Sequence, residues 1–161
     1  MSGSRGEPAT AREAMARRRA ARLAAVQGLY QLELAGGEPS AVVQEFLARA
    51  LDNDTGGCAS LDVAWFRKVL EGAWANRVRL DAELGSALAQ GWTLSRCGAV
   101  VRAILRAGAF ELAALPEVPT KVAINEYVEI AHLFSSGGEP GFVHAVLDRI
   151  ASRFRAGRGE L

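Results

Sequence analysis

Arginines dominate the beginning of the chain in a pattern that suits phosphate binding. Arg17, Arg18, Arg19 and Arg22 fall together, just ahead of apolar residues at helical spacing. Guanidinium groups make paired hydrogen bonds to phosphate oxygens, so a cluster fixed to a helix suits a nucleic-acid backbone. A solvated helix end is the ordinary interpretation, but arginines near a helix N-terminus oppose the helix dipole and need another reason. The cluster therefore predicts a nucleic-acid-binding arm.

A second basic site is predicted on the last helix of the chain. Phe142, Arg149 and Arg153 share one flank of that helix, beside its apolar stripe. An aromatic ring next to guanidinium groups can stack an unpaired base while the arginines contact phosphates. Phe142 could equally be a hydrophobic staple that packs the helix entry. The two interpretations differ in exposure, because a staple is buried and a stacking platform keeps a free face.

Side chains suited to catalysis or metal binding form no recognisable constellation. His132 and His144 are the only histidines, and neither has a second ligand at short spacing. A phosphate-binding glycine loop and a nucleophile elbow are both absent from the sequence. Glu126 and Glu129 are expected to cap a helix end, to pair with Lys121 or to face solvent. We therefore expect no catalytic residue, no metal, no cofactor and no enzymatic activity.

The charge distribution and the cysteines indicate where the protein is found and what it can bind. The formal net charge is only +1, yet residues 1–22 carry six arginines against two glutamates, so basic charge is concentrated at one end. Cys58 and Cys97 form no Cys-x-x-Cys unit, which fits a reducing compartment. No apolar run is long enough for a transmembrane helix or a signal peptide. We expect a cytoplasmic protein that does not enter a membrane.

The element that must position the arginines is a long first helix. Its predicted range is 12–35, with Gly36 and Gly37 ending it, and residues 1–11 are expected to be disordered. The predicted core stripe consists of Leu23, Val26, Tyr30 and Leu34, with Arg18 and Arg22 on its flank.

Helical periodicity continues through the rest of the chain without any strand signal. Pro39 opens a short helix, and a long segment over 61–90 is expected to bend near Arg79–Leu80 or at Gly85. Further helices are predicted over 100–112, 120–134 and from Pro140 onwards. The helix over 120–134 is apolar around much of its circumference, which predicts a central, mostly buried position. The fold class is all-α, with about seven helices.

Several segments, in order, resemble the NusB family. They are Arg17–Tyr30, Ala103–Arg106, Phe110–Leu112, Val118–Glu126 and Phe142–Asp148. The resemblance covers nearly all of 12–155 and implies an all-helical bundle of two packed subdomains. We accordingly expect one NusB-like domain over 12–156 and a disordered tail over 157–161.

The resemblance also implies a function. Members of this family are transcription antitermination factors that bind single-stranded boxA RNA of ribosomal-operon transcripts together with NusE, a small-subunit ribosomal protein, within the RNA polymerase antitermination complex. By position, Arg18, Arg19 and Arg22 would contact RNA, and Phe142 matches the family's aromatic residue at the start of the last helix. Tyr30 and the start of the helix segment Val101–Arg106 lie where the family meets its ribosomal partner.

Other functions remain open at this point. One is a helical RNA-recruitment domain of the kind attached to RNA methyltransferases, and another is a protein-interaction adaptor without an antitermination role. A membrane-surface helix is a third, but the core needs the apolar stripe of the first helix, which argues against it.

Overall fold

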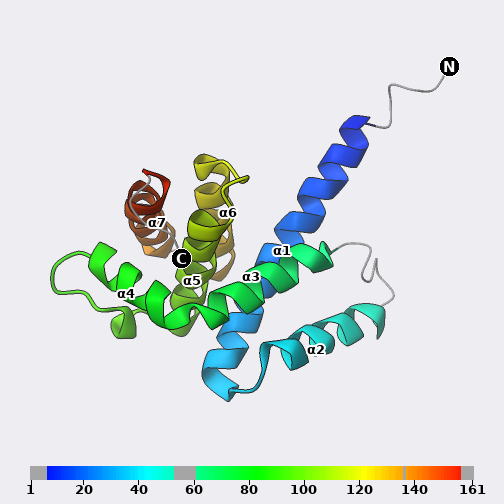
Figure 1. The fold of residues 1–161 in the computed structure, drawn as a ribbon, viewed down its shortest axis with the longest axis horizontal. Helices are drawn as coiled ribbons and strands as arrows, with labels where there is room; N and C mark the ends of the chain where they lie inside the picture. Colours follow the sequence, from blue (N-terminus) through cyan, green and yellow to red (C-terminus); the bar gives the residue numbers. More distant parts are fainter. Residues whose placement is uncertain (1–6, 53–60, 136, 157–161) are drawn as a thin grey trace.

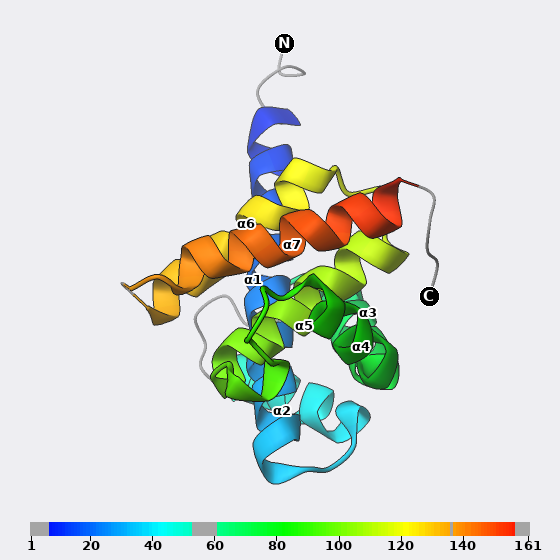
Figure 2. The same ribbon diagram turned by 90° about the vertical axis from the view of Figure 1, so that its left-hand side faces the viewer.

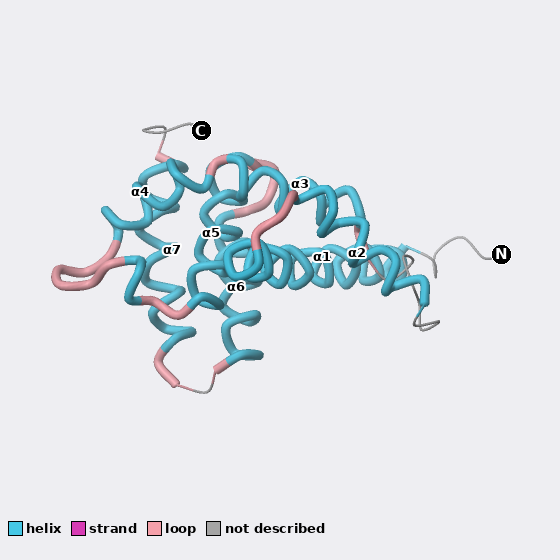
Figure 3. The backbone as a smooth tube through the Cα atoms, turned by 90° about the horizontal axis from the view of Figure 1, so that it is seen from below, coloured by secondary structure: helices cyan, strands magenta, loops and turns pink. Residues whose placement is uncertain are grey.

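The computed structural model describes residues 7–52, 61–135 and 137–156, and these residues are almost entirely helical (Figures 1 and 3). Within these ranges there are seven α-helices and no strand, as the sequence predicts. The helices are α1 (Glu7–Ala35), α2 (Pro39–Asp52), α3 (Val63–Ala75), α4 (Arg77–Ala87), α5 (Ala99–Ala114), α6 (Thr120–Phe134) and α7 (Glu139–Arg155), with a short 3₁₀ helix, η2 (Leu94–Arg96), before α5. None of the described helices is both long enough and apolar enough to cross a bilayer.

The helices form two groups that share one core. α1, α2 and α3 pack on one another, and α4, α5, α6 and α7 form the second group. α1 and α3 both pack on α5 (Figure 2). One cluster of buried apolar side chains therefore runs through both groups.

The central helix is α5, not α6 as its composition predicts. Every residue of α5 from Ala103 to Leu112 is buried, because α1, α3, α4, α6 and α7 all pack around it. On α6, Val122, Leu133 and Phe134 are exposed, with 69% of Leu133 accessible. Apolar composition alone could not show that one side of α6 has no neighbour.

Close packing against α5 depends on a missing side chain in α3. A Cβ at Gly72 would lie 2.1 Å from the ring of Phe110 on α5. Real Cβ atoms do not approach other atoms so closely, so glycine allows the Phe110 ring to lie against the α3 backbone.

Two helix boundaries differ from those expected. α1 begins at Glu7, so the predicted disorder over 1–11 is wrong for 7–11, whereas residues 1–6 lie outside the described residues. Pro8 stands in the first turn of α1, where a proline lacks only an N–H that would have no helical partner. The predicted tail over 157–161 also lies outside the described residues.

The long segment over 61–90 divides at Asn76, before the expected bend. The Asn76 side-chain amide donates to the Gly72 carbonyl oxygen at 2.8 Å, and the Asn76 backbone N–H donates to the same oxygen. Asparagine competes locally for backbone groups in this way, so it ends α3 where periodicity gave no warning.

Candidate nucleic-acid interface

Arg18 lies against an aromatic ring at the surface. Its Cζ atom is 3.9 Å from the centroid of the Trp65 ring on α3. The contact between Arg18 Nε and Asp62 Oδ2 is 3.9 Å, which is an ion pair without a hydrogen bond. The side chain remains 42% exposed. Because stacking occupies a face of the guanidinium group, its N–H edges remain free to meet a ligand.

Arg19 is held by a carboxylate of α6. Its Nε donates to Glu126 Oε2 and its Nη2 donates to Oε1, both at 3.0 Å. The Arg19 side chain is 62% exposed and lies beside a groove between α1 and α6. The hydrogen bonds to Glu126 raise the pKa of Arg19 above its usual value. Glu126 therefore pairs with Arg19, whereas the sequence predicts a helix cap, a pair with Lys121 or a side chain that faces solvent.

Arg22 lies inside the protein, contrary to its expected position among the phosphate contacts. Its side chain is 4% exposed, and its Nε donates to Glu111 Oε1 at 2.9 Å and to Oε2 at 3.0 Å. The buried face of α1 includes Ala21, Ala25, Val26, Leu29 and Leu32, and Arg22 belongs to it. The predicted stripe is rotated from this face, since Tyr30 and Leu34 are exposed. Arg22 is thus a core residue that joins α1 to α5.

Glu111 is the shared acceptor beneath this surface. It is fully buried on α5 and also accepts a hydrogen bond from Trp65 Nε1 at 2.9 Å. The hydroxyl of Tyr127 on α6 lies 3.5 Å from Glu111 Oε1. Burial, followed by the charge of Glu111, raises the pKa of Tyr127 well above its ordinary value, so the phenol stays protonated. One buried carboxylate therefore fixes both the Trp65 ring on which Arg18 rests and Arg22, which lies one turn after Arg18 on α1.

The first turns of α1 extend past the neighbouring helices (Figures 1 and 2). The arginine cluster lies where α1 meets α3 and α6, because Arg18 contacts Asp62 at the start of α3 and Arg19 pairs with Glu126 on α6. Arg17 is exposed there, and no residue described by the structure gives its side chain an ion pair or hydrogen bond. Its carbonyl oxygen accepts from the backbone N–H of Asp62 at 3.1 Å, which ties this turn of α1 to the start of α3.

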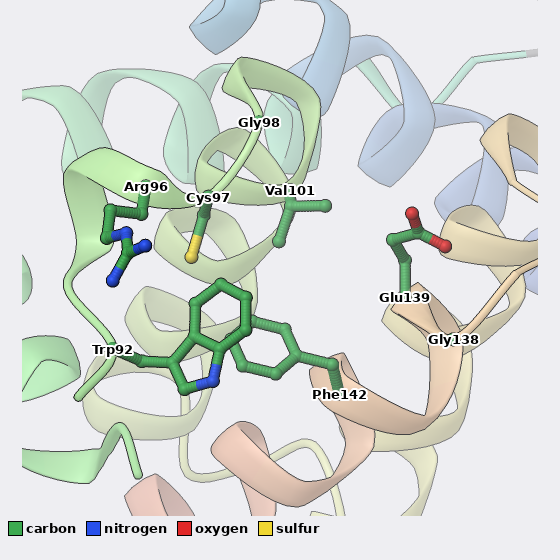
Figure 4. A pocket seen from close by; sticks show the side chains of 8 residues that line it. All are labelled: Trp92, Arg96, Cys97, Gly98, Val101, Gly138, Glu139 and Phe142. Carbon is green, nitrogen blue, oxygen red and sulfur yellow. The ribbon is translucent and has the colours of Figure 1, made fainter. Parts of the chain in front are cut away.

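Phe142 lies in a pocket of about 360 Å³ formed by the loop before α5, the start of α5 and the start of α7 (Figure 4). Its ring centroid is 5.9 Å from that of Trp92, whose side chain is 52% exposed. Arg96 lines the same pocket, with its Cζ 5.8 Å from the centroid of the Trp92 ring. Phe142 itself is half-buried, which is intermediate between the staple and the stacking platform.

The structure does not leave Arg149 and Arg153 free beside Phe142 as expected. Arg149 Nη1 donates to the carbonyl oxygen of Ala87 at 2.8 Å, and Arg153 Nη2 pairs with Glu83 at 2.8 Å. Both arginines thus tie α7 to α4. Arg96 is the arginine that shares the pocket with Phe142.

The three residues expected at the partner surface have different environments. Tyr30 is 38% exposed on α1, and Val101 is half-buried in the Phe142 pocket. Arg106 is buried, with Nε and Nη2 on Asp81 and Nη1 on Glu33, all at 2.8 Å, so it is not available to a partner.

Glu33 joins the helix that carries Tyr30 to the helix that carries Val101. It lies one turn after Tyr30 on α1 and pairs with Arg102, the neighbour of Val101 on α5. These pairs fix the two helices to each other beside both candidate positions.

Sequence reasoning missed Trp65, Glu111, Trp92 and Arg96. Trp92 follows Gly91, whose φ of +89° makes a turn, and no pattern in the sequence connects that turn with Phe142. A signal for Arg22 did exist, because it precedes Val26 by one helical turn and Leu29 by two. No comparable signal pointed to Glu111, since its partner Arg22 lies 89 residues away.

Within the described ranges, no group of three or more His, Cys, Asp or Glu residues could hold a metal ion. His132 and His144 are both exposed. The groups exposed at this surface are guanidinium edges, which bind phosphates, and aromatic faces, which stack on bases.

Comparison with known proteins agrees with the resemblance seen in the sequence. A family model described as the NusB family matches residues 19–152. Transcription antitermination protein NusB of Nitrobacter hamburgensis is 47% identical over 143 residues, which cover 88% of this chain and 89% of that protein. The protein of the same name from Rhizobium rhizogenes is 49% identical over 140 residues, covering 86% and 88%.

Solved structures have the same fold. T. maritima NusB aligns with a TM-score of 0.71 at 29% identity, covering 84% of this chain and 90% of that one. A chain from a crystal structure of antitermination factors NusB and NusE in complex with dsRNA aligns with a TM-score of 0.73, covering 86% and 98%, although its 23% identity supports the fold alone. The match of the family model over most of the chain and the identity to these relatives show that the chain belongs to the NusB family.

Proposed function

We propose that this chain is a transcription antitermination factor. In this proposal it binds single-stranded boxA-like RNA of ribosomal-operon transcripts together with the small-subunit ribosomal protein NusE, within the RNA polymerase antitermination complex. The relatives named above are antitermination proteins, and one structural neighbour was solved with NusE and dsRNA. The protein acts by binding, without catalysis.

The observation that carries the proposal is the exposed arginine cluster on α1. Arg17, Arg18 and Arg19 follow one another around the helix, and all three keep guanidinium edges accessible. Three adjacent cations can neutralise successive phosphates of a single strand, and such contacts dominate affinity and its salt dependence. Arg22 has no part in this contact, because its guanidinium is buried against Glu111.

The pocket of Phe142 and Trp92 is the proposed base contact. Two aromatic rings beside Arg96 offer a surface on which an unpaired base can stack. Double-stranded RNA keeps its bases stacked internally, so this pocket favours a single strand. Tyr30, which is exposed on α1, and Val101, which is half-buried in the Phe142 pocket, are the proposed NusE contacts. The Glu33–Arg102 pair joins the helices that carry them.

The test is RNA binding measured by fluorescence anisotropy at several salt concentrations. The probes are a boxA-like single strand, a scrambled strand and a duplex, each with and without NusE. Arg18→Ala with Arg19→Ala should weaken binding and reduce the salt slope by about 1.4, since each lost single-strand phosphate contact removes about 0.7. Arg49→Ala is the matched control in the measurements without NusE, because Arg49 is also exposed and also rests on a ring, that of Phe46, but lies on α2 in the groove of Tyr30.

The outcomes separate the functions under comparison. Preference for the boxA-like strand that increases with NusE supports the antitermination factor. NusE binding without RNA binding would instead make the protein an adaptor. Equal affinity for all three RNAs in every condition would contradict the proposal.

A further inference from the structure

We propose that Glu126 is a positioning residue for RNA binding, which holds the Arg19 guanidinium so that one of its edges is already directed at a phosphate. This inference rests on the function proposed above and adds to it a residue that does not itself touch RNA. The observations are the geometry of the pair, the burial of the carboxylate and the contrast with Arg17.

The geometry of the pair leaves three of the five N–H donors of Arg19 without a hydrogen bond to Glu126. A guanidinium group has five N–H donors, and Glu126 accepts one from Nε and one from Nη2. Both N–H groups of Nη1 and the second N–H of Nη2 remain, and no described residue accepts from them. These donors form the end of the side chain, which is the edge that makes paired hydrogen bonds to a phosphate. With 62% of the side chain exposed, that edge is open to solvent.

The carboxylate lies behind the arginine and not beside the ligand. The Glu126 side chain is only 11% exposed, so a phosphate approaching from solvent meets Arg19 first. Arg22 Nη1 lies 3.9 Å from Glu126 Oε2 on the buried side, which gives the carboxylate a second positive neighbour. Arg19 and Arg22 together face the two carboxylates of Glu126 and Glu111, so no uncompensated negative charge remains beneath Arg19 to repel RNA.

Glu126 is itself held in place. It lies on α6 next to Tyr127, which is fully buried and reaches Glu111. Glu111 holds Arg22, which in turn approaches Glu126. The chain of charges therefore runs from the buried carboxylate of Glu111 outward to Arg19, and each group fixes the next.

Arg17 differs from Arg19 because no described carboxylate holds its side chain. It is exposed on the same helix, and none of the described residues fixes its side chain. A free arginine loses rotamer freedom when it binds a phosphate, whereas Arg19 has already lost most of that freedom on folding. Arg19 should therefore contribute more to affinity than its neighbour Arg17.

The experiment compares two carboxylates of α6. Glu126→Gln removes a charge and one hydrogen bond to Arg19, and Glu129→Gln removes a charge one turn away. Glu129 is the matched control, because it is exposed in the same groove and acts on Arg19 only through its charge. RNA affinity, salt slope and melting temperature are measured for both variants with the boxA-like strand.

Only one of the two variants should weaken RNA binding. Glu126→Gln should weaken RNA binding about two- to tenfold, the cost of ordering one long side chain on binding. Glu129→Gln should leave binding unchanged or tighten it, because only a negative charge is removed. If Glu126 merely repelled RNA, Glu126→Gln would tighten binding, and that result would overturn the proposal.

Further variants separate positioning from damage to the fold. Glu126→Asp keeps the charge but shortens the side chain, so it should also weaken binding. In an Arg19→Ala background, Glu126→Gln should have no further effect on affinity, whereas a general structural role would still reduce it. If the wild-type protein does not bind the RNA, or Arg19→Ala does not weaken binding, the proposed function or its arginine site fails. If Arg19→Ala weakens binding but Glu126→Gln does not, only the positioning role fails.

Discussion

Replacing Arg22 with methionine should destabilise the protein strongly, even though the substitution lies within an arginine-rich surface segment. Methionine keeps most of the apolar stem but removes the donor that serves both oxygens of Glu111 at 2.9 and 3.0 Å. Removing one partner of a buried ion pair typically costs about 3–5 kcal/mol, because the other charge stays buried.

The lower end of that range applies here. Glu111 retains the hydrogen bond from Trp65 Nε1 at 2.9 Å and the longer contact with Tyr127 at 3.5 Å. We therefore expect a loss of about 3 kcal/mol in the free energy of unfolding. For a domain of this size that corresponds to a fall of about 6–12 °C in melting temperature.

The assay is thermal and urea unfolding followed by circular dichroism. Arg18→Met is the control on the same helix, and it should cost less than about 1 kcal/mol because its ion pair is exposed. Adding Glu111→Gln to Arg22→Met should recover part of the loss, since no unpaired carboxylate then remains buried.

A loss of RNA affinity in Arg22→Met with unchanged stability would refute this reasoning. Arg22 would then be a phosphate ligand, as its place in the sequence alone suggests.

Two further predictions concern packing and pH. Gly72→Ala should lower the free energy of unfolding by about 1–3 kcal/mol or more, measured by urea unfolding, because its Cβ would lie 2.1 Å from the Phe110 ring; unchanged stability would mean that α3 and α5 separate at little cost. Burial alone would raise the pKa of Glu33, but the hydrogen bonds and charges of Arg102 and Arg106 outweigh it and lower the pKa below its ordinary 4.5. Glu33 therefore stabilises the folded state above about pH 4.5, and that contribution is lost as the pH falls through its folded-state pKa. Unfolding measured between pH 7 and 3 should show a weaker acid dependence for Glu33→Gln than for the wild type, and identical profiles would contradict this assignment.

Local signals in the sequence predicted most of the helices. Periodic apolar residues between glycines and prolines give α6 its observed bounds, Thr120–Phe134, and place the start of α7 within one residue. The break at Asn76 was misplaced because it depends on a side chain bonding to its own helix, which apolar periodicity does not report. The sequence also did not show that α5 is more deeply buried than α6, because the burial of a helix depends on how many other helices surround it.

The sequence predicted the arginine cluster as a unit, but it did not show that the arginines have different roles. Arg18, Arg19 and Arg22 are chemically identical, and their roles differ only through Trp65, Glu126 and Glu111. Those three partners come from three other helices. A surface arginine and a buried one look the same in a sequence until the residue opposite is known, so spacing alone could not separate them.

The position of Glu111 has a consequence for the order of events during synthesis. The Arg22–Glu111 bond joins residues 89 positions apart, and the Arg19–Glu126 bond spans 107. Contacts so distant in sequence form only after the intervening chain has been made, because the ribosome releases the N-terminus first. A nascent chain that has reached only α3 therefore has its arginines but neither carboxylate that orders them. The RNA-binding end of α1, made first, acquires its final geometry only once α5 and α6 have emerged.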